Sequence, residues 1–165
     1  IPQLRAAFKK DGTITAANAS SISDGASALV LASANAVDQN NLTPMARILG
    51  VQSFAREPGE FTIAPIGAIK GLLNTLDWQV GDIDLFEINE AFAMVTMLAT
   101  QELGIDASKV NVYGGACAQG HPIGSTGSRI ILTLITALKN KGLKRGVAAL
   151  CIGGGEATAV AVELV

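Results

Sequence analysis

Apolar runs of strand length alternate with stretches of helical spacing along the 165 residues, and this order constrains the fold most strongly. Strands are predicted at Thr13–Ala17, Ala26–Leu31, Ala46–Phe54, Asp82–Ile88, Val110–Tyr113, Gly146–Cys151 and Thr158–Leu164. Helices are predicted at Ala34–Asn41, Pro65–Leu76, Ala91–Leu103 and Gly127–Lys141. Strands alternating with helices predict an α/β layered domain.

The last two predicted strands are joined only by Ile152-Gly153-Gly154-Gly155. A link this short predicts a hairpin, so the sheet is expected to be mixed, mostly parallel with one antiparallel turn-back. Open sheets of this kind carry their chemistry beyond the carboxyl ends of the strands. Three loops rich in polar residues or glycine fall there: Asn89-Glu90, Gly114–Ser128 and Cys151–Gly155.

Charge and cysteine content narrow the range of partners. The net charge is −2 and no basic run is present, so no nucleic-acid partner is expected. The longest apolar runs, Ala26–Ala34 and Gly146–Ile152, are too short to span a bilayer, and no signal peptide is visible. Because Ile1 is not an initiator methionine, a removed N-terminal signal stays open. The two cysteines indicate free thiols in a reducing compartment, which predicts a soluble, cytoplasmic protein without a membrane partner.

His121 is the only histidine and lies in Gly120-His121-Pro122-Ile123-Gly124, at the entrance to a predicted helix. The following proline keeps His121 extended, and the flanking glycines let other groups approach closely. An imidazole held in this way is a candidate base near neutral pH. A helix-capping or core histidine remains the alternative.

Cys151 ends a predicted strand, just before three glycines whose N–H groups are free to turn toward a ligand oxygen. Its thiol is therefore a candidate proton carrier, although a free cysteine is more often a small buried apolar residue. Cys117 lies between Ala116 and Ala118, which favours a packing role.

Asn89 and Glu90 lie between a predicted strand end and a helix start, where an N-cap is the alternative reading. Gly124–Gly127 resembles a phosphate cradle only weakly, because the Lys-Ser/Thr ending of a P-loop is absent. One histidine and two separated cysteines give no metal-ligand spacing, so no metal is expected. One His, one Cys and one Asn beside a glycine hairpin indicate acyl-transfer or proton-transfer chemistry.

Three separated motifs resemble the C-terminal signatures of thiolases, in the same order along the chain. They are Asn89-Glu90-Ala91-Phe92-Ala93, Gly114-Gly115-Ala116 through Gly124, and Cys151-Ile152-Gly153-Gly154-Gly155. Asn18–Ala26 resembles the entry to the same domain. The resemblance implies a five-stranded mixed sheet with helices on both faces. It also implies that residues 1–165 are a thiolase C-terminal domain, without the N-terminal nucleophile domain and the CoA-binding insertion.

The resemblance also implies a role for each site residue. His121 would activate the nucleophilic cysteine and, with a water held by Asn89, stabilise the thioester oxygen. Cys151 would exchange the proton at the α-carbon of acetyl-CoA, and the N–H of Gly153 would contribute to a second oxyanion hole. Phe92 and Phe61 would lie near the pantetheine or acyl group of the substrate.

By the same resemblance, the parent enzyme is a thiolase of fatty acid metabolism that uses acetyl-CoA or 3-ketoacyl-CoA as substrate and needs no cofactor. Its partners would be its own N-terminal domain and further copies of itself in a homo-oligomer. The isolated chain is expected to be inactive. Cys117 and Gln119 stand where the family commonly has aliphatic residues, which leaves the acyl chain-length preference open.

Three other readings compete with a thiolase. A non-catalytic scaffold or lipid-carrier domain of the same fold would not require His121, Cys151 and Asn89 together. A ketoacyl synthase would use two histidines, whereas this chain has one. A Cys-His hydrolase would use Cys151 as its nucleophile.

Overall fold

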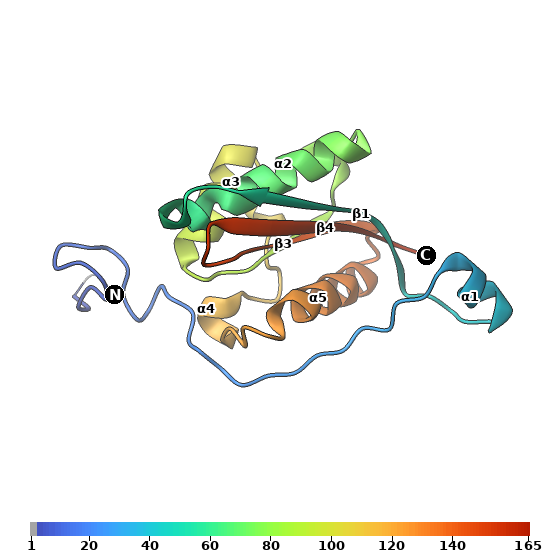
Figure 1. The fold of residues 1–165 in the computed structure, drawn as a ribbon, viewed down its shortest axis with the longest axis horizontal. Helices are drawn as coiled ribbons and strands as arrows, with labels where there is room; N and C mark the ends of the chain where they lie inside the picture. Colours follow the sequence, from blue (N-terminus) through green and yellow to red (C-terminus); the bar gives the residue numbers. More distant parts are fainter. Residues whose placement is uncertain (1–2) are drawn as a thin grey trace.

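Four strands form one mixed sheet in a computed structural model that describes residues 3–165. They are β1 (Ala46–Ala55), β2 (Leu85–Ile88), β3 (Arg145–Cys151) and β4 (Glu156–Leu164), in the order β1-β4-β3-β2. β2 and β3 run parallel, whereas β4 is antiparallel to both β1 and β3. Figure 1 labels three of these strands, β1, β3 and β4, side by side. The predicted α/β class, the mixed sheet and the terminal hairpin are confirmed. The prediction that the sheet is mostly parallel is wrong, because only β2 and β3 pair in parallel, whereas the β1–β4 and β3–β4 pairs are antiparallel. The prediction of five strands is wrong, because the sheet has four.

The predicted strand Val110–Tyr113 does not form, and the side chain of Asn111 bonds to the edge of β2 in its place. Only Val110 forms a bridge, to Phe86 of β2, and the N–H of Asn111 then donates to the Phe86 carbonyl at 2.9 Å. Asn111 has a left-handed φ of 46°, which turns the backbone away from the sheet. Its amide Oδ1 accepts from the N–H of Ile88 and its Nδ2 donates to the Ile88 carbonyl, both at 2.8 Å. The backbone groups of Phe86 and Ile88 at the edge of β2 therefore have hydrogen-bond partners without a fifth strand.

Helices cover both faces of the sheet (Figure 1). The structure contains α1 (Ala34–Gln39), α2 (Ala64–Leu76), α3 (Ala93–Leu103), α4 (Ala116–Gln119) and α5 (Thr126–Lys141), with 3₁₀ turns at Pro58–Ile63, Val80–Asp82 and Ala107–Lys109. The four predicted helices are confirmed, with ends shifted by one or two residues. α2 and α3 lie on one face and α5 lies on the other.

Alternation along β3 divides the core between the two faces. Val147 and Ala149 pack under α2 and α3, while Ala148, between them, packs against Leu134 and Leu138 of α5. α2 supplies the apolar stripe Ala68, Ile69, Leu72 and Leu73 to the first of these clusters. The central part of the sheet is thus buried on both sides, whereas the edge strand β1 keeps Ile48 and Val51 46% and 57% exposed.

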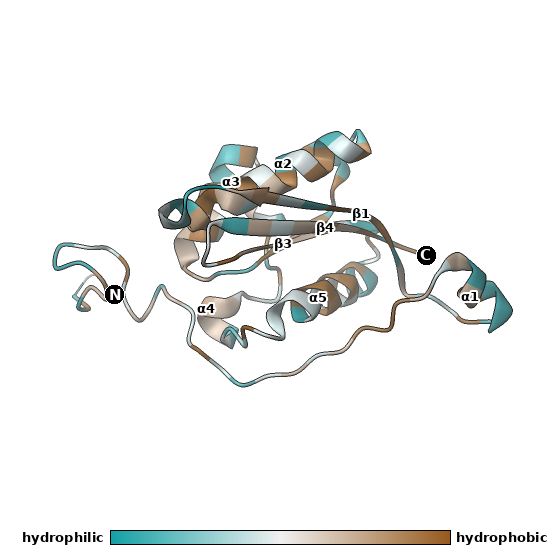
Figure 2. Cartoon of the chain, in the orientation of Figure 1, coloured by the Kyte–Doolittle hydropathy of each residue, from teal (hydrophilic) through white to brown (hydrophobic). Residues whose placement is uncertain are grey.

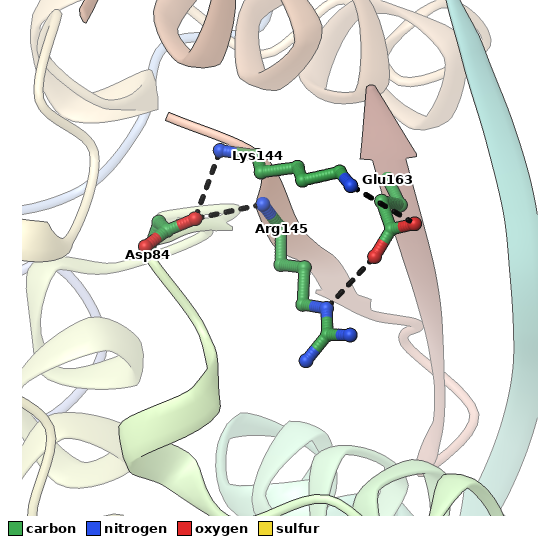
Figure 3. Close-up of polar contacts among 4 residues, drawn as sticks. All are labelled: Asp84, Lys144, Arg145 and Glu163. Atoms are coloured by element: carbon green, nitrogen blue, oxygen red, sulfur yellow. Dashed lines mark hydrogen bonds and ion pairs between the residues drawn. The ribbon is translucent and has the colours of Figure 1, made fainter. Parts of the chain in front are cut away.

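A polar cluster fixes the start of β3 at the end of the sheet opposite the glycine turn (Figure 3). The carboxylate of Asp84 accepts from the backbone N–H groups of Lys144 and Arg145, at 2.9 and 2.8 Å. The Arg145 guanidinium pairs with Glu163 of β4 at 2.8 Å and lies 4.8 Å from the centre of the Trp78 ring. These contacts set the register of β3 against β2 and β4.

Two predicted strands near the N-terminus are wrong. Residues 13–17 form a turn, in which the N–H of Thr15 donates to Asn18 Oδ1 at 2.7 Å. Residues 26–31 are extended but pair with no strand in the described part of the chain, and Val30 and Leu31 are 94% and 74% exposed. The second half of this segment is apolar and lies outside the sheet (Figure 2). An apolar run indicates that its side chains favour burial, but it does not show that a strand or helix of the same chain buries them.

The first residues of α5 hold this extended segment. Ser27 Oγ lies 2.6 Å from the hydroxyl oxygens of both Ser125 and Ser128.

None of the helices in residues 3–165 combines the length and apolar character that crossing a bilayer requires.

Candidate active site

The predicted site residues lie where the parallel strands β2 and β3 end. Asn89 directly follows β2, and its N–H donates to the carbonyl of Ala149 at 2.9 Å. Cys151 is the last residue of β3. The first turn of α5 reaches the same edge, because a Cβ on Gly127 would lie 3.6 Å from Leu150 Cδ2. The turn after β3, α4 and the start of α5 accordingly gather at one end of the sheet (Figure 1).

Asn89 carries a buried amide that the protein does not satisfy. The residue is 2% exposed, and neither Oδ1 nor Nδ2 has a hydrogen-bond partner among the described residues. An unsatisfied buried polar group costs about 1–3 kcal/mol. The N-cap reading does not apply, because α3 begins at Ala93 and its N-cap is Phe92. The amide is therefore free to bind a water or a substrate oxygen.

Cys151 is buried in the larger of the two core clusters. It is 8% exposed and belongs to the core cluster under α2 and α3, against which Phe61 and Phe92 also pack. The two ring centroids are 6.2 Å apart. Burial raises the pKa of the Cys151 thiol, so the thiol keeps its proton near neutral pH and can donate it.

The glycine turn leaves the backbone N–H groups of Gly153 and Gly154 without a hydrogen bond among the described residues. The N–H of Ile152 donates to Glu156 O at 2.8 Å and that of Gly155 to Ile152 O at 3.1 Å, which closes the turn. Gly155 has a φ of 104°, which favours glycine at this position. Gly153 takes no part in these bonds, and a Cβ built on it would meet nothing within 4 Å. Its N–H is open to a ligand oxygen.

His121 is anchored at its backbone and at its ring. Its N–H donates to Ser21 O at 2.9 Å, and its Nδ1 lies 2.7 Å from Thr126 Oγ1. Burial lowers the pKa of the imidazole, and the positive charge of Arg129 lowers it further. The ring is therefore neutral near pH 7 and able to accept a proton.

The structure brings some of these residues together and leaves others separate. Cys151, Phe61 and Phe92 share one cluster, and Asn89 directly follows β2, which pairs with the strand that ends at Cys151. No hydrogen bond within residues 3–165 joins the side chains of His121, Cys151 and Asn89. Their joint action on one substrate stays a prediction. Across residues 3–165, no group of three or more His, Cys, Asp and Glu side chains is arranged to hold a metal ion.

Sequence reasoning missed Glu87, which points from β2 into the protein. It is 3% exposed, and its Oε1 has no hydrogen-bond partner in the described chain. Burial raises the pKa of its carboxyl to about 7, with Arg129 opposing the shift and Glu90 adding to it. The signal was present in the sequence, since Glu87 is the one acid among the apolar residues of Leu85–Ile88.

The two departures from the family pattern have structural roles. The N–H of Cys117 donates to Glu90 Oε2 at 3.1 Å, and burial is the main cause that raises the pKa of its thiol to about 11. Gln119 Nε2 donates to Tyr113 O at 2.9 Å, while its Oε1 accepts from Arg129 at 3.2 Å. Gln119 Nε2 also lies 3.2 Å from Gly114 O, and none of these three contacts involves His121.

Two thiolase family models match this chain. Residues 42–164 match the family described as thiolase, C-terminal domain, and residues 1–35 match thiolase, N-terminal domain. The chain is 48% identical to the acetyl-CoA acetyltransferase of Chromobacterium violaceum over 163 residues, which cover 99% of this chain and 42% of the relative. It is 45% identical to the human mitochondrial 3-ketoacyl-CoA thiolase, covering 99% of this chain and 41% of that protein.

Solved structures give the same result. The Bacillus anthracis acetyl-CoA acetyltransferase superposes with a TM-score of 0.96 at 44% identity, over 99% of this chain and 42% of that one. The Ascaris suum Acat5 thiolase, solved in complex with coenzyme A, superposes with a TM-score of 0.94 at 47% identity, over 99% and 43%. This chain spans about two fifths of the length of these relatives. It belongs to the thiolase family.

Proposed function

We propose that the full-length protein containing this chain is an acyltransferase that condenses two acetyl-CoA molecules to acetoacetyl-CoA or cleaves 3-ketoacyl-CoA with CoA. The names of its relatives, acetyl-CoA acetyltransferase and 3-ketoacyl-CoA thiolase, support both directions. The observation that carries the proposal is the amide of Asn89, buried and without a partner among the described residues, at the strand ends beside a protonated thiol. A packing role gives no reason to leave that amide unsatisfied.

In this proposal His121 and Asn89 act on the thioester. The nucleophile is a cysteine of an N-terminal domain outside this chain. The neutral imidazole takes its proton, so that the S–H bond breaks, an N–H bond forms and sulfur keeps the electron pair. A water held by Asn89, together with His121, then stabilises the thioester oxygen when an enolate forms. Removing one such oxyanion donor costs roughly 100-fold to 1,000-fold in rate.

Cys151 and Gly153 serve the other half of the reaction. In the cleavage direction the protonated Cys151 thiol donates its proton to the α-carbon of the leaving acetyl-CoA carbanion, so that its S–H bond breaks, a C–H bond forms and sulfur keeps the electron pair. In the condensation direction the Cys151 thiolate removes that proton again and returns to the thiol. The open N–H of Gly153 donates to the oxygen of the acyl-enzyme. Phe92 and Phe61, which pack against the cluster that contains Cys151, border the pantetheine or acyl group.

The same proposal covers the rest of the protein. Residues 42–164 act as the C-terminal domain, and residues 1–35 as a part of the N-terminal domain, of a cytoplasmic homo-oligomer of fatty acid metabolism. Catalysis requires no cofactor besides the CoA thioester. The isolated 165-residue chain is inactive, because it lacks the nucleophile and most of the CoA site.

Mass spectrometry of the acyl-enzyme tests this assignment. The full-length protein is incubated with acetyl-CoA and digested, and the acetylated peptide is identified. The acetyl group is expected on a cysteine outside the printed sequence, and Cys117→Ala is the matched control that should leave labelling unchanged. Acetylation of Cys151 would instead identify a Cys-His hydrolase. Binding of CoA without acetylation or turnover would favour a non-catalytic scaffold or lipid-carrier domain.

A further inference from the structure

Thr126 is the one side chain of the described residues that contacts the imidazole of His121 through a hydrogen bond. Its Oγ1 lies 2.7 Å from His121 Nδ1 and 3.0 Å from the carbonyl oxygen of Pro122. Thr126 is 1% exposed and is the first residue of α5, so the helix fixes its hydroxyl in place. None of the motifs that relate this chain to thiolases depends on Thr126 having this contact.

The two contacts of this hydroxyl share a single proton. A threonine hydroxyl donates one hydrogen bond and accepts others, and the Pro122 carbonyl can only accept. The Pro122 carbonyl also accepts from the N–H groups of Ser125 and Thr126, at 2.8 and 2.9 Å, and the Thr126 hydroxyl is a third donor to it at 3.0 Å. When the proton is directed to Pro122, Thr126 Oγ1 has only lone pairs to offer Nδ1, and Nδ1 must then carry a hydrogen.

We propose that Thr126 is a positioning residue that holds His121 in the Nδ1–H tautomer and leaves Nε2 as the atom that accepts a proton. The backbone of His121 is held as well, by its N–H bond to Ser21 O at 2.9 Å. With both the backbone and Nδ1 fixed, the ring has one orientation, and Nε2 points away from the start of α5.

The catalytic effect of Thr126 rests on the proposed function, whereas the tautomer of His121 can be measured without it. If His121 takes the proton of a thiol, only an unprotonated ring nitrogen accepts it, and Thr126 decides which nitrogen that is. The opposite arrangement, with Thr126 donating to Nδ1, would put the hydrogen on Nε2 and remove the base from the substrate side.

Nitrogen NMR of the histidine reads the tautomer without any assay of activity. His121 is the only histidine of the 165-residue chain, so ¹⁵N-histidine labelling gives one pair of ring signals. Above the imidazole pKa, Nδ1 is expected in the protonated range and Nε2 in the unprotonated range. The reverse pattern in the wild-type chain would overturn the proposal, whether or not the full-length protein is a thiolase.

Matched variants separate the hydroxyl from the packing. Thr126→Ser keeps the hydroxyl and should keep the wild-type tautomer. Thr126→Val keeps the shape and removes the hydroxyl, so it should lose the fixed Nδ1–H form. Ser128→Ala removes a hydroxyl from the same turn that contacts Ser27 and not His121, and it should leave the ring signals unchanged. An unchanged tautomer in Thr126→Val, in a chain with wild-type circular dichroism, would contradict the assignment.

Turnover gives the second readout. In the full-length protein Thr126→Val should lower kcat about 10-fold or more with little change in KM, and Thr126→Ser should restore most of it. Equal kcat in wild type and Thr126→Val would refute the catalytic consequence. A full-length wild type without thiolase activity would refute the proposed function alone and leave the NMR result valid.

Discussion

Replacing Glu87 by glutamine should make the stability of this chain less dependent on pH. The folded-state pKa of the carboxyl is raised from 4.5 to about 7 because the group is buried. Below the unfolded-state pKa the carboxyl is protonated in both states and its burial carries no charge penalty. As the pH rises toward the folded-state pKa, the unfolded chain loses its proton first, so stability falls.

The size of the effect follows from the difference between the two pKa values. Each unit corresponds to 1.36 kcal/mol, so the shift from 4.5 to about 7 amounts to about 3 kcal/mol at most by about pH 8. A glutamine side chain at this position would have nearly the same shape and no ionisation. We therefore expect Glu87→Gln to gain up to about 3 kcal/mol relative to wild type between pH 4.5 and about pH 8.

Urea unfolding of the chain measures this difference. Trp78, the only tryptophan, packs against the core and reports unfolding by its fluorescence. Unfolding is measured at about pH 4.5 and about pH 8. The matched control is Glu102→Gln, which changes an exposed glutamate near the end of α3 and should shift the free energy of unfolding equally at these two pH values. An advantage of Glu87→Gln that does not grow with pH would refute the argument that burial governs this carboxyl.

Three further predictions concern single side chains. Asn111→Ala should destabilise the chain by about 2–3 kcal/mol in urea unfolding, because both backbone groups of Ile88 lose a partner; a loss below about 0.5 kcal/mol would contradict the edge-capping role. Gly146→Ala should cost about 1–3 kcal/mol in the same assay, since a Cβ would lie 2.7 Å from Leu134 Cδ1, and a neutral result would show that α5 moves freely. Cys117 should react with iodoacetamide about 100-fold more slowly near neutral pH than a thiol of pKa 9.0, because its pKa is raised to about 11, and alkylation at the unperturbed rate would exclude that shift.

Local sequence patterns predicted an element correctly where neighbouring residues alone determine its structure. Pro65 and the apolar stripe that follows it predict α2, and the Gly153–Gly155 link predicts the hairpin of β3 and β4. They failed where the partner of a segment decides its structure. Ala26–Leu31 has the composition of a buried strand, but no strand of the described chain pairs with it. Val110–Tyr113 looks like a strand, and only the amide of Asn111, a tertiary contact, shows why the pairing stops.

The candidate site also has features that the sequence predicts and one that only the folded chain shows. The order of strands and helices predicts that Asn89 and Cys151 lie at neighbouring strand ends, since parallel strands end at one edge. Glu87 could have been noticed as an acid in an apolar strand. The contact between Thr126 and His121 could not, because it requires the path of the loop from Pro122 to the first turn of α5. Spacing along the sequence does not give that path.

Exchange of the α-protons of acetyl-CoA tests most directly whether Cys151 performs the chemistry of this site. The full-length wild type and Cys151→Ala are incubated with acetyl-CoA in deuterated water, and mass spectrometry follows both deuterium in the acetyl group and acetyl transfer to the nucleophilic cysteine. We predict that Cys151→Ala abolishes deuterium exchange and retains most of the acetyl transfer. An equal loss of both half-reactions would contradict the assignment of Cys151 as the residue that moves the α-proton.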